Sequence, residues 1–316
     1  MTTPSGGARP RVSIGLPVYN GERYVGEAIE AVLTQTFGDF ELVISDNAST
    51  DGTREICQEF ARNDARVRYS RSPENLGAAP NFNRCFALAQ PIEYFKWITY
   101  DDLMSDDFLE RCIEALDCDA CVSVAFPAMV TADAEGNVIG RQLREDLSLL
   151  ESEPGRRAQR LIEYGLEAPD IYWTVYGLMR RSAIEQTELH GNYIASDQVL
   201  LFQLALTGKF VQVPGALFIR RAHPDAWTMK ADRTPKGDAA WFGARSRSRV
   251  VLPHWTLLGR HLKSVFRGQL SLQERARCLR AVARRGLREW RPLGGDVKLA
   301  MRDVIRRGSA SALRKQ

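Results

Sequence analysis

Two adjacent acids, Asp101 and Asp102, directly follow the apolar run of residues 94–99. Carboxylate oxygens are the ligands that hard divalent cations prefer, and such a cation commonly bridges phosphate groups. The alternative is that one acid only caps the helix that follows, since Asp is a favoured N-cap residue. Because the pair comes at the end of a strand-like run, we favour a site that holds a metal ion and phosphates.

A second polar cluster, residues 46–53 (DNASTDGT), follows the strand-like run of residues 40–45. A carboxylate such as Asp46 at a strand end can accept a hydrogen bond from a base or a ribose hydroxyl, as the acidic residue of dinucleotide-binding folds does. A turn with a capping residue is the alternative. The chain has no GxGxxG after its first strand and no GxxxxGK[ST], so dinucleotide-binding and P-loop folds lose support.

The first third of the chain supplies the elements that can bring these clusters together. Strands are predicted at residues 11–18, 40–45, 67–70 and 94–99, and helices at 22–36, 53–63, 81–89 and 106–116. This alternation predicts an α/β fold with a mainly parallel sheet flanked by helices. Ligands of such sheets bind beyond the carboxyl ends of the strands, where both clusters and the pair Tyr19-Asn20 lie.

The rest of the chain is patterned less regularly. Strands are predicted at residues 121–131, 171–180, 210–213 and 216–220, and helices at 156–164 and 196–207. Residues 224–249 are rich in polar residues, Pro and Gly and predict a loop. The chain from residue 249 onward has the spacing of apolar residues that indicates helices.

Four ordered motifs resemble those of the family 2 glycosyltransferases. They are residues 13–22 (SIGLPVYNGE), 45–53 (SDNASTDGT), the step through Asn75-Leu76-Gly77 to Asn83, and 97–102 (WITYDD). The spacing between them also fits that family. The resemblance implies a Rossmann-like GT-A fold, a nucleotide-diphosphate sugar donor, Mg²⁺ or Mn²⁺ as cofactor, and transfer to an acceptor hydroxyl with inversion.

The resemblance also implies roles for individual residues of these motifs. Pro17, Tyr19 and Glu22 are expected to line the base and ribose pocket, and Asp46 to contact the base. Asp101 corresponds to the second acid of the metal-binding DxD motif, with Asp102 as a supporting metal residue. Thr99 stands where the family usually has the first acid, which removes one charge from the site. The motifs further predict donor contacts from Asn47, Asn75, Asn83 and Tyr100.

Two later residues complete the site that the resemblance implies. Asp197 opens the helix predicted at residues 196–207, where the family carries an acid facing the acceptor, and it is the candidate general base. A helix cap is the alternative. His223 is expected to complete the metal shell, and neutral imidazole suits Mn²⁺ better than Mg²⁺. A surface histidine is the alternative.

The second half of the chain holds four further candidates for donor binding. Arg220 and Arg221 suit a diphosphate because a guanidinium matches phosphate oxygens, although neighbours on a strand point to opposite faces. Tyr176 and Gly177 fall in the strand that the family runs beneath the donor sugar, and glycine there would allow close approach to the backbone. Packing can equally require that glycine.

The C-terminal part of the chain is strongly basic. Residues 249–316 contain 17 Lys and Arg but 4 Asp and Glu, although the whole chain carries a net charge of only +4. Such a segment favours an anionic partner, and peripheral contact with a membrane is one interpretation. A solvated helical surface is the other. No nucleic-acid-binding motif accompanies the charge, so nucleic acid is not expected as a partner.

We predict a flexible N-terminus at residues 1–10 and a GT-A domain at 11–222, with a nucleotide-sugar-binding half at 11–117 and an acceptor-side half at 118–222. A flexible loop at 223–249 and a basic helical extension at 250–316 would follow. No apolar run reaches the roughly 20 residues that a membrane span needs, and no signal peptide is visible. We therefore expect a cytoplasmic protein, either free or peripheral to the inner face of the membrane.

The acceptor stays open between a glycan, a lipid-linked molecule and a small molecule. Cell-envelope polysaccharide or glycoconjugate synthesis is the favoured role. A natural-product (antibiotic) glycosyltransferase is one alternative. A non-catalytic sugar-nucleotide-binding protein is another, and Thr99 in the acid position is the feature that favours it.

Overall fold

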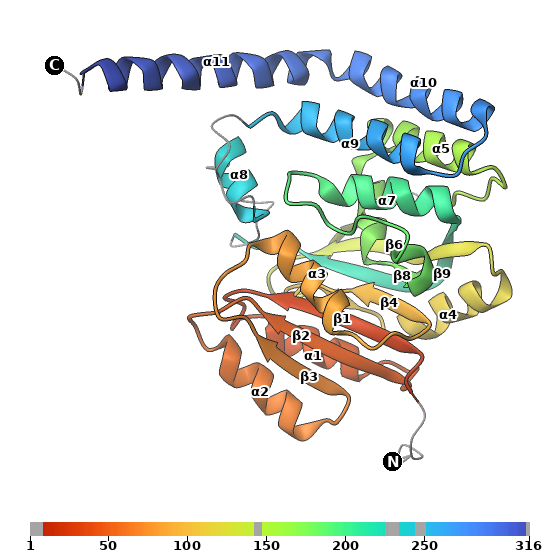
Figure 1. The fold of residues 1–316 in the computed structure, drawn as a ribbon. Helices are drawn as coiled ribbons and strands as arrows, with labels where there is room; N and C mark the ends of the chain where they lie inside the picture. Colours follow the sequence, from red (N-terminus) through yellow and green to blue (C-terminus); the bar gives the residue numbers. More distant parts are fainter. Residues whose placement is uncertain (1–8, 142–146, 225, 227–233, 244–250, 314–316) are drawn as a thin grey trace.

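The structure, a computed structural model, describes residues 9–141, 147–224, 226, 234–243 and 251–313. Within these residues, nine strands form one mixed sheet in the order β3-β2-β1-β4-β8-β6-β9-β5, and β7 pairs with β6. Helices flank the sheet, and the C-terminal helices form a further layer at one end of the molecule (Figure 1). The predicted α/β fold with a mainly parallel sheet and a C-terminal helical extension is confirmed.

The first four long strands are parallel neighbours. They are β1 (Val12–Val18), β2 (Phe40–Asp46), β3 (Val67–Arg71) and β4 (Tyr94–Trp97). All residues of β1 and β2 are buried, as expected for parallel strands covered on both faces. The helices that alternate with them are α1 (Val25–Leu33), α2 (Thr53–Asn63), α3 (Ala78–Leu88) and α4 (Phe108–Cys118). The predicted elements of this part are all present, and α2 has the predicted bounds.

The second half of the sheet is mixed. Its strands are β5 (Leu103–Met104), β6 (Val122–Ala132), β7 (Val138–Arg141), β8 (Leu178–Arg180) and β9 (Lys209–Arg221). Strand β6 runs parallel to β9 and antiparallel to β7 and β8. The helices are α5 (Pro154–Glu167), the 3-10 helix η1 (Pro169–Tyr176), α6 (Arg181–Ile184), α7 (Ser196–Thr207) and α8 (Pro235–Trp241).

Two strand predictions in this half differ from the structure. The strand predicted at residues 171–180 is wrong, because most of it is the 3-10 helix η1 and only β8 is extended. The backbone N–H of Ile171 donates to the Ala168 carbonyl and that of Gly177 to the Thr174 carbonyl, each three residues back, which is the hydrogen-bond spacing of a 3-10 helix. The two strands predicted at 210–213 and 216–220 are one strand, β9, whose register on β6 shifts where Gly215 has φ of +86°.

The C-terminal layer consists of α9 (Pro253–Arg267), α10 (Leu272–Arg288) and α11 (Trp290–Leu313). Helix α10 starts with a capping box in which Ser271 and Glu274 exchange hydrogen bonds. It approaches α5 so closely that a Cβ added at Gly155 would lie 2.9 Å from Cα of Glu274. None of the helices in the described ranges is both long and apolar enough to span a membrane.

Much of the two segments predicted to be flexible lies outside the described residues. The parts that lie outside are residues 1–8 of the N-terminus, and residues 225, 227–233 and 244–249 of the loop predicted at 223–249. Inside that loop, residues 235–241 form α8. The domain boundaries given above stay predictions.

Candidate functional site

A pocket of about 860 Å³ lies beyond the carboxyl ends of β1, β2 and β4. Ten of the predicted site residues line it: Pro17, Tyr19, Asn47, Asn75, Tyr100, Asp101, Asp102, Tyr176, Arg220 and Arg221. The predicted residues that do not line it are Glu22, Asp46, Asn83, Gly177, Asp197 and His223. Helix α8 contributes Ala240 and Trp241, so the predicted loop takes part in the pocket wall.

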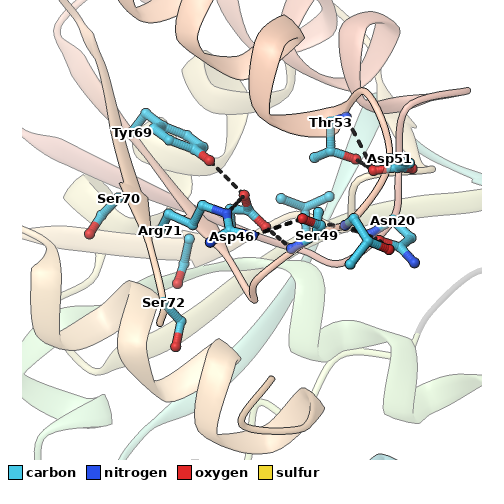
Figure 2. Close-up of polar contacts among 12 residues, drawn as sticks. Asn20, Asp46, Ser49, Asp51, Thr53, Tyr69, Ser70, Arg71 and Ser72 are labelled. Carbon is cyan, nitrogen blue, oxygen red and sulfur yellow. Dashed lines mark hydrogen bonds and ion pairs between the residues drawn. The ribbon is translucent and has the colours of Figure 1, made fainter. Parts of the chain in front are cut away.

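Asp46 does not line the pocket but holds the turn after β2 that borders it. Its carboxylate is fully buried and accepts hydrogen bonds from the Ser49 backbone N–H at 2.8 Å and the Tyr69 hydroxyl at 2.5 Å, beside Arg71 at 3.4 Å (Figure 2). These partners fold the turn after β2 and tie it to β3. The structure thus gives Asp46 a role in holding the turn, and its contact with a base stays a prediction.

Glu22 joins the turn after β1 to the turn after β2. Its carboxylate accepts from the Gly52 N–H at 2.6 Å, while Asp51 accepts from the Glu22 N–H at 3.1 Å. Asn20, at φ of +51°, accepts from the Thr50 N–H at 2.8 Å. Asparagine tolerates this left-handed conformation better than most residues. The two turns are therefore locked together, and Tyr19 is left 42% exposed on the pocket wall.

The predicted asparagines have different surroundings. Asn47 donates to Asn75 at 2.9 Å and accepts from the Leu76 N–H at 2.8 Å, so these two form one side of the pocket. Asn83 faces elsewhere, because its amide exchanges two hydrogen bonds with the backbone of His190. Sequence reasoning missed Asn81, which lines the pocket and holds the ends of β1 and β2 together through its amide.

Asp101 and His223 meet at the pocket, with Oδ2 and Nε2 3.0 Å apart. The His223 side chain is 1% exposed and packs on the Tyr24 ring at 4.5 Å, and its Nδ1 has no hydrogen-bond partner among the described residues. Cis ligands of an octahedral ion with bonds of about 2.1 Å lie about 3 Å apart. The separation of the two atoms is therefore compatible with both of them binding one divalent cation.

Asp102 does not share this orientation. Its Oδ1 accepts from the Arg221 backbone N–H at 2.9 Å and its Oδ2 from the Thr99 hydroxyl, so it connects the end of β4 to β9. Burial, together with the neighbouring Asp101, raises the pKa of Asp102 to about 7. Among the residues that the structure describes, no three His, Cys, Asp or Glu side chains gather as a metal centre. Asp102 is thus held by Arg221 and Thr99, and the metal-binding roles of Asp101, Asp102 and His223 stay predictions.

The two arginines at the end of β9 diverge, as expected for neighbours on a strand. The Arg220 guanidinium lies 4.7 Å from the centre of the Trp173 ring. Arg221 lies 4.7 Å from that of Tyr24 and pairs with Glu27. Arg221 is 2% exposed, and its Nε and Nη1 have no acceptor among the described residues. Buried donors without acceptors on a pocket wall suit a phosphate.

Tyr176 also lines the pocket. Its ring stacks on Phe218 at 5.2 Å, and burial, with Asp102, Asp197 and Asp101 nearby, raises its pKa well above the usual value. Gly177 lies behind it, where a Cβ would come within 2.7 Å of the Ala125 carbonyl oxygen. Packing on β6 therefore accounts for this glycine.

Asp197 lies in the first turn of α7, just beyond the lining residues. Ala195 is the N-cap, and no side chain caps the helix, so the cap alternative does not describe this end. Burial raises the pKa of Asp197 to about 6, although backbone N–H groups of the first turn act in the opposite direction. Its charge reaches Tyr176, which does line the pocket.

Comparison with known proteins gives a family. The model for glycosyl transferase family 2 matches residues 13–187, more than half of the chain. Chondroitin synthase of Escherichia coli is 34% identical over 130 residues, which are 41% of this chain and 19% of that protein. TuaG of Bacillus subtilis, named for teichuronic acid biosynthesis, is 36% identical over 106 residues, or 34% of this chain and 42% of that protein. The chain spans less than half the length of these relatives.

Solved structures share the fold. That of S. aureus TarS 1-349 in complex with UDP-GlcNAc matches with a TM-score of 0.65 at 16% identity, covering 93% of this chain and 81% of that one. The mannosyltransferase PcManGT of Pyrobaculum calidifontis, in complex with GDP-Man and Mn²⁺, gives a TM-score of 0.50 at 16% identity. The fold is GT-A, and the chain belongs to glycosyl transferase family 2. The resemblance found in the four motifs is confirmed.

Proposed function

We propose that this glycosyltransferase moves a sugar from a nucleoside diphosphate to an acceptor hydroxyl, with Asp197 as the general base. The observation that supports the proposal most is the pair of Asp101 and His223, whose atoms lie 3.0 Å apart, together with Arg221 on the pocket wall, whose Nε and Nη1 have no acceptor among the described residues. A carboxylate, an imidazole and a guanidinium at one pocket edge suit a diphosphate with its divalent cation. The similar structures of TarS and PcManGT are complexes with the nucleoside-diphosphate sugars UDP-GlcNAc and GDP-Man, the second together with Mn²⁺.

Asp101 and His223 would hold Mg²⁺ or Mn²⁺, which would neutralise charge on the departing diphosphate. Arg221, and Arg220 from the opposite side, would donate to phosphate oxygens. Electrostatic stabilisation of this kind is usually a large part of the catalytic effect. Tyr19 after β1, Asn47 after β2 and Asn75 before α3 would contact the nucleoside, and their position in the pocket lining supports this.

The acceptor would approach from the side of α7. Asp197 would take the proton from the acceptor hydroxyl as its oxygen attacks the anomeric carbon, and the bond to the diphosphate oxygen would break on the opposite face. The result is inversion. A base with a pKa of about 6 is ionised at neutral pH and basic enough to share the proton in the transition state.

We infer a role in cell-envelope polysaccharide or glycoconjugate synthesis from the named roles of the relatives. Chondroitin synthase and TuaG both carry names of polysaccharide synthesis. A small natural-product acceptor remains the alternative for this site. The cytoplasmic location stays a prediction.

The test is titration calorimetry with a panel of nucleoside diphosphates and their sugars, with and without Mn²⁺. Wild type is expected to bind one nucleotide in a metal-dependent manner, and Asp101→Ala to lose that binding. Asp106→Ala, an exposed acid five residues on, is the matched control and should bind like wild type. No binding of any nucleotide by wild type would reject the proposed donor site.

A non-catalytic sugar-nucleotide-binding protein is the second candidate, and Thr99 favours it because the family's first acid is missing. The binding assay does not separate the two, whereas release of free sugar from the bound donor does. Slow donor hydrolysis by wild type that Asp197→Asn abolishes would support an enzyme. Tight binding with neither hydrolysis nor transfer to any acceptor would support the binding protein.

A further inference from the structure

We propose that the outer face of α10 and α11 is a docking surface for an anionic lipid bilayer. These helices form the layer most remote from the first strands of the sheet (Figure 1). Two side-chain stripes with helical spacing run along this face, one apolar and one basic. The docking does not depend on the proposed donor or acceptor chemistry.

The apolar stripe consists of Leu287 at the end of α10 and of Trp290, Val297 and Met301 in α11. Steps of seven and four residues put the last three side chains on one face of α11. Leu287 is 75% exposed, Trp290 63% and Met301 62%, so the fold leaves this stripe uncovered. A tryptophan among aliphatic side chains is typical of a helix that lies in the membrane interface.

The basic stripe has the same kind of spacing within each helix. Arg280, Arg284 and Arg288 repeat every four residues on α10, and Arg291, Lys298 and Arg302 each follow an apolar-stripe residue of α11 by one position. All six are exposed. Arg284 lies 3.7 Å from Glu163, and Arg291 lies against the Trp290 ring at 5.4 Å. Adjacent apolar and basic stripes are the pattern of an interfacial helix that binds anionic headgroups while its apolar side chains enter the acyl boundary.

Residues 280–302 contribute no exposed acid to this face, and Glu163 of α5 beside Arg284 is the acid that reaches it from another element among the described residues. The acids in that range are Glu289 and Asp296. Glu289 pairs with Arg285, and Asp296 is 4% exposed and pairs with His254. The positive charge is therefore concentrated outward, which complements an anionic surface. The same concentration of like charge opposes pairing of this face with a second copy of the chain.

The surface is firmly connected to the acceptor side of the pocket. Arg285 of α10 donates to Gln198 at 2.7 Å and to the Tyr172 hydroxyl at 3.3 Å, and Gln198 follows Asp197 in α7. Trp255 of α9 donates to the Leu293 carbonyl at 3.1 Å and secures the start of α11. A chain docked in this way would hold α7 at a fixed orientation to the bilayer, which suits a lipid-linked acceptor; that consequence alone rests on the proposed function.

Co-sedimentation of the full chain with vesicles tests the docking. Vesicles of phosphatidylcholine mixed equally with phosphatidylglycerol are expected to bind it, more weakly as salt is added, and pure phosphatidylcholine vesicles to bind it poorly. The double variant Arg288→Gln/Arg291→Gln should lower the partition coefficient about thirty-fold, since each basic side chain near an anionic surface contributes a factor of about five. Arg54→Gln/Arg62→Gln, on exposed positions of α2, removes the same charge and should bind like wild type.

The apolar stripe has its own pair of variants. Trp290→Ala should weaken vesicle binding about tenfold or more, whereas Ile139→Ala, a 63% exposed side chain on β7, should leave it unchanged. Circular dichroism and nucleotide binding show that each variant is folded. Equal losses in the α10/α11 and control variants would overturn the proposal. So would failure to bind anionic vesicles while the chain binds a single-stranded RNA.

Discussion

The two sides of the pocket are built differently. The early side consists of the turns after β1 and β2 and the segment before α3. Its contacts join residues closer in the chain, such as Asn47 and Asn75, 28 positions apart, and Gly21 and Thr53, 32 positions apart. The late side joins His223 to Asp101 over 122 positions and Arg221 to Glu27 over 194. On the early side, Asp46 and Glu22 are paired within the protein. On the late side, the buried Nε and Nη1 of Arg221 and Nδ1 of His223 have no hydrogen-bond partner among the described residues.

This difference indicates that the early side is held in place by contacts within the protein, whereas the late side has polar groups that a ligand can bind. A buried polar atom without a partner costs free energy comparable to a lost hydrogen bond. Such atoms occur on the late side at the positions where a diphosphate and its cation are proposed to bind. Substitutions should therefore reduce stability on the early side and reduce binding or turnover on the late side.

The largest expected effect is on turnover. Asp197→Asn should lower kcat by about 10²–10⁴ and leave the affinity for the donor nucleotide unchanged, because it removes only the base. Single-turnover transfer and calorimetry measure the two quantities. The melting temperature at pH 8 should be equal to that of wild type or higher: burial raises the pKa of Asp197 above the unfolded value, so its ionised form opposes folding there. A loss of kcat below threefold would show that another group is the base.

The early side gives the next largest effect, and it is one of stability. Asp46→Asn should lower the free energy of unfolding by about 2 kcal/mol, because the charge that accepts from Ser49 and Tyr69 and pairs with Arg71 is lost. Urea unfolding measures it. Asp39→Asn, an exposed acid before β2, is the control and should change little. Normal stability with lost nucleotide binding would instead make Asp46 a direct base contact.

The pH dependence of turnover sharpens the assignment of the base. A carboxylate must be ionised to accept a proton, so kcat/KM should rise with pH through about 6 and be about tenfold below its plateau at pH 5. Steady-state rates at saturating metal concentration across this range measure it. A profile that is flat between pH 5 and pH 7 would contradict the expected ionisation of Asp197.

The early side of the pocket could be predicted from the sequence better than the late side. The parallel strands and the motifs of the early side were predictable, since each turn is folded by contacts with a neighbouring motif. The orientation of Asp102 was not, because it depends on the Arg221 backbone 119 residues away. The strand predicted at 171–180 was wrong because alternating large side chains resemble a strand even where Pro169 starts a 3-10 helix. Asn81 was missed because the family motif used for the prediction includes Asn83 and not Asn81.

The smallest predicted effects are those of substitutions at Asn81 and Asn83, both in α3. Comparing them distinguishes a residue that affects stability alone from one that also affects nucleotide binding. Residues two apart on a helix point to different sides, and here Asn81 lines the pocket while Asn83 binds the His190 backbone. Asn83→Ala should lower the free energy of unfolding by about 1 kcal/mol with unchanged nucleotide affinity. Asn81→Ala should weaken nucleotide binding as well, because the ends of β1 and β2 lose their link beside the pocket. Urea unfolding and calorimetry on both variants decide the matter. If Asn83→Ala weakened nucleotide binding more than Asn81→Ala, the residue predicted from the motif would be the donor contact, and the division between the two faces of α3 would fail.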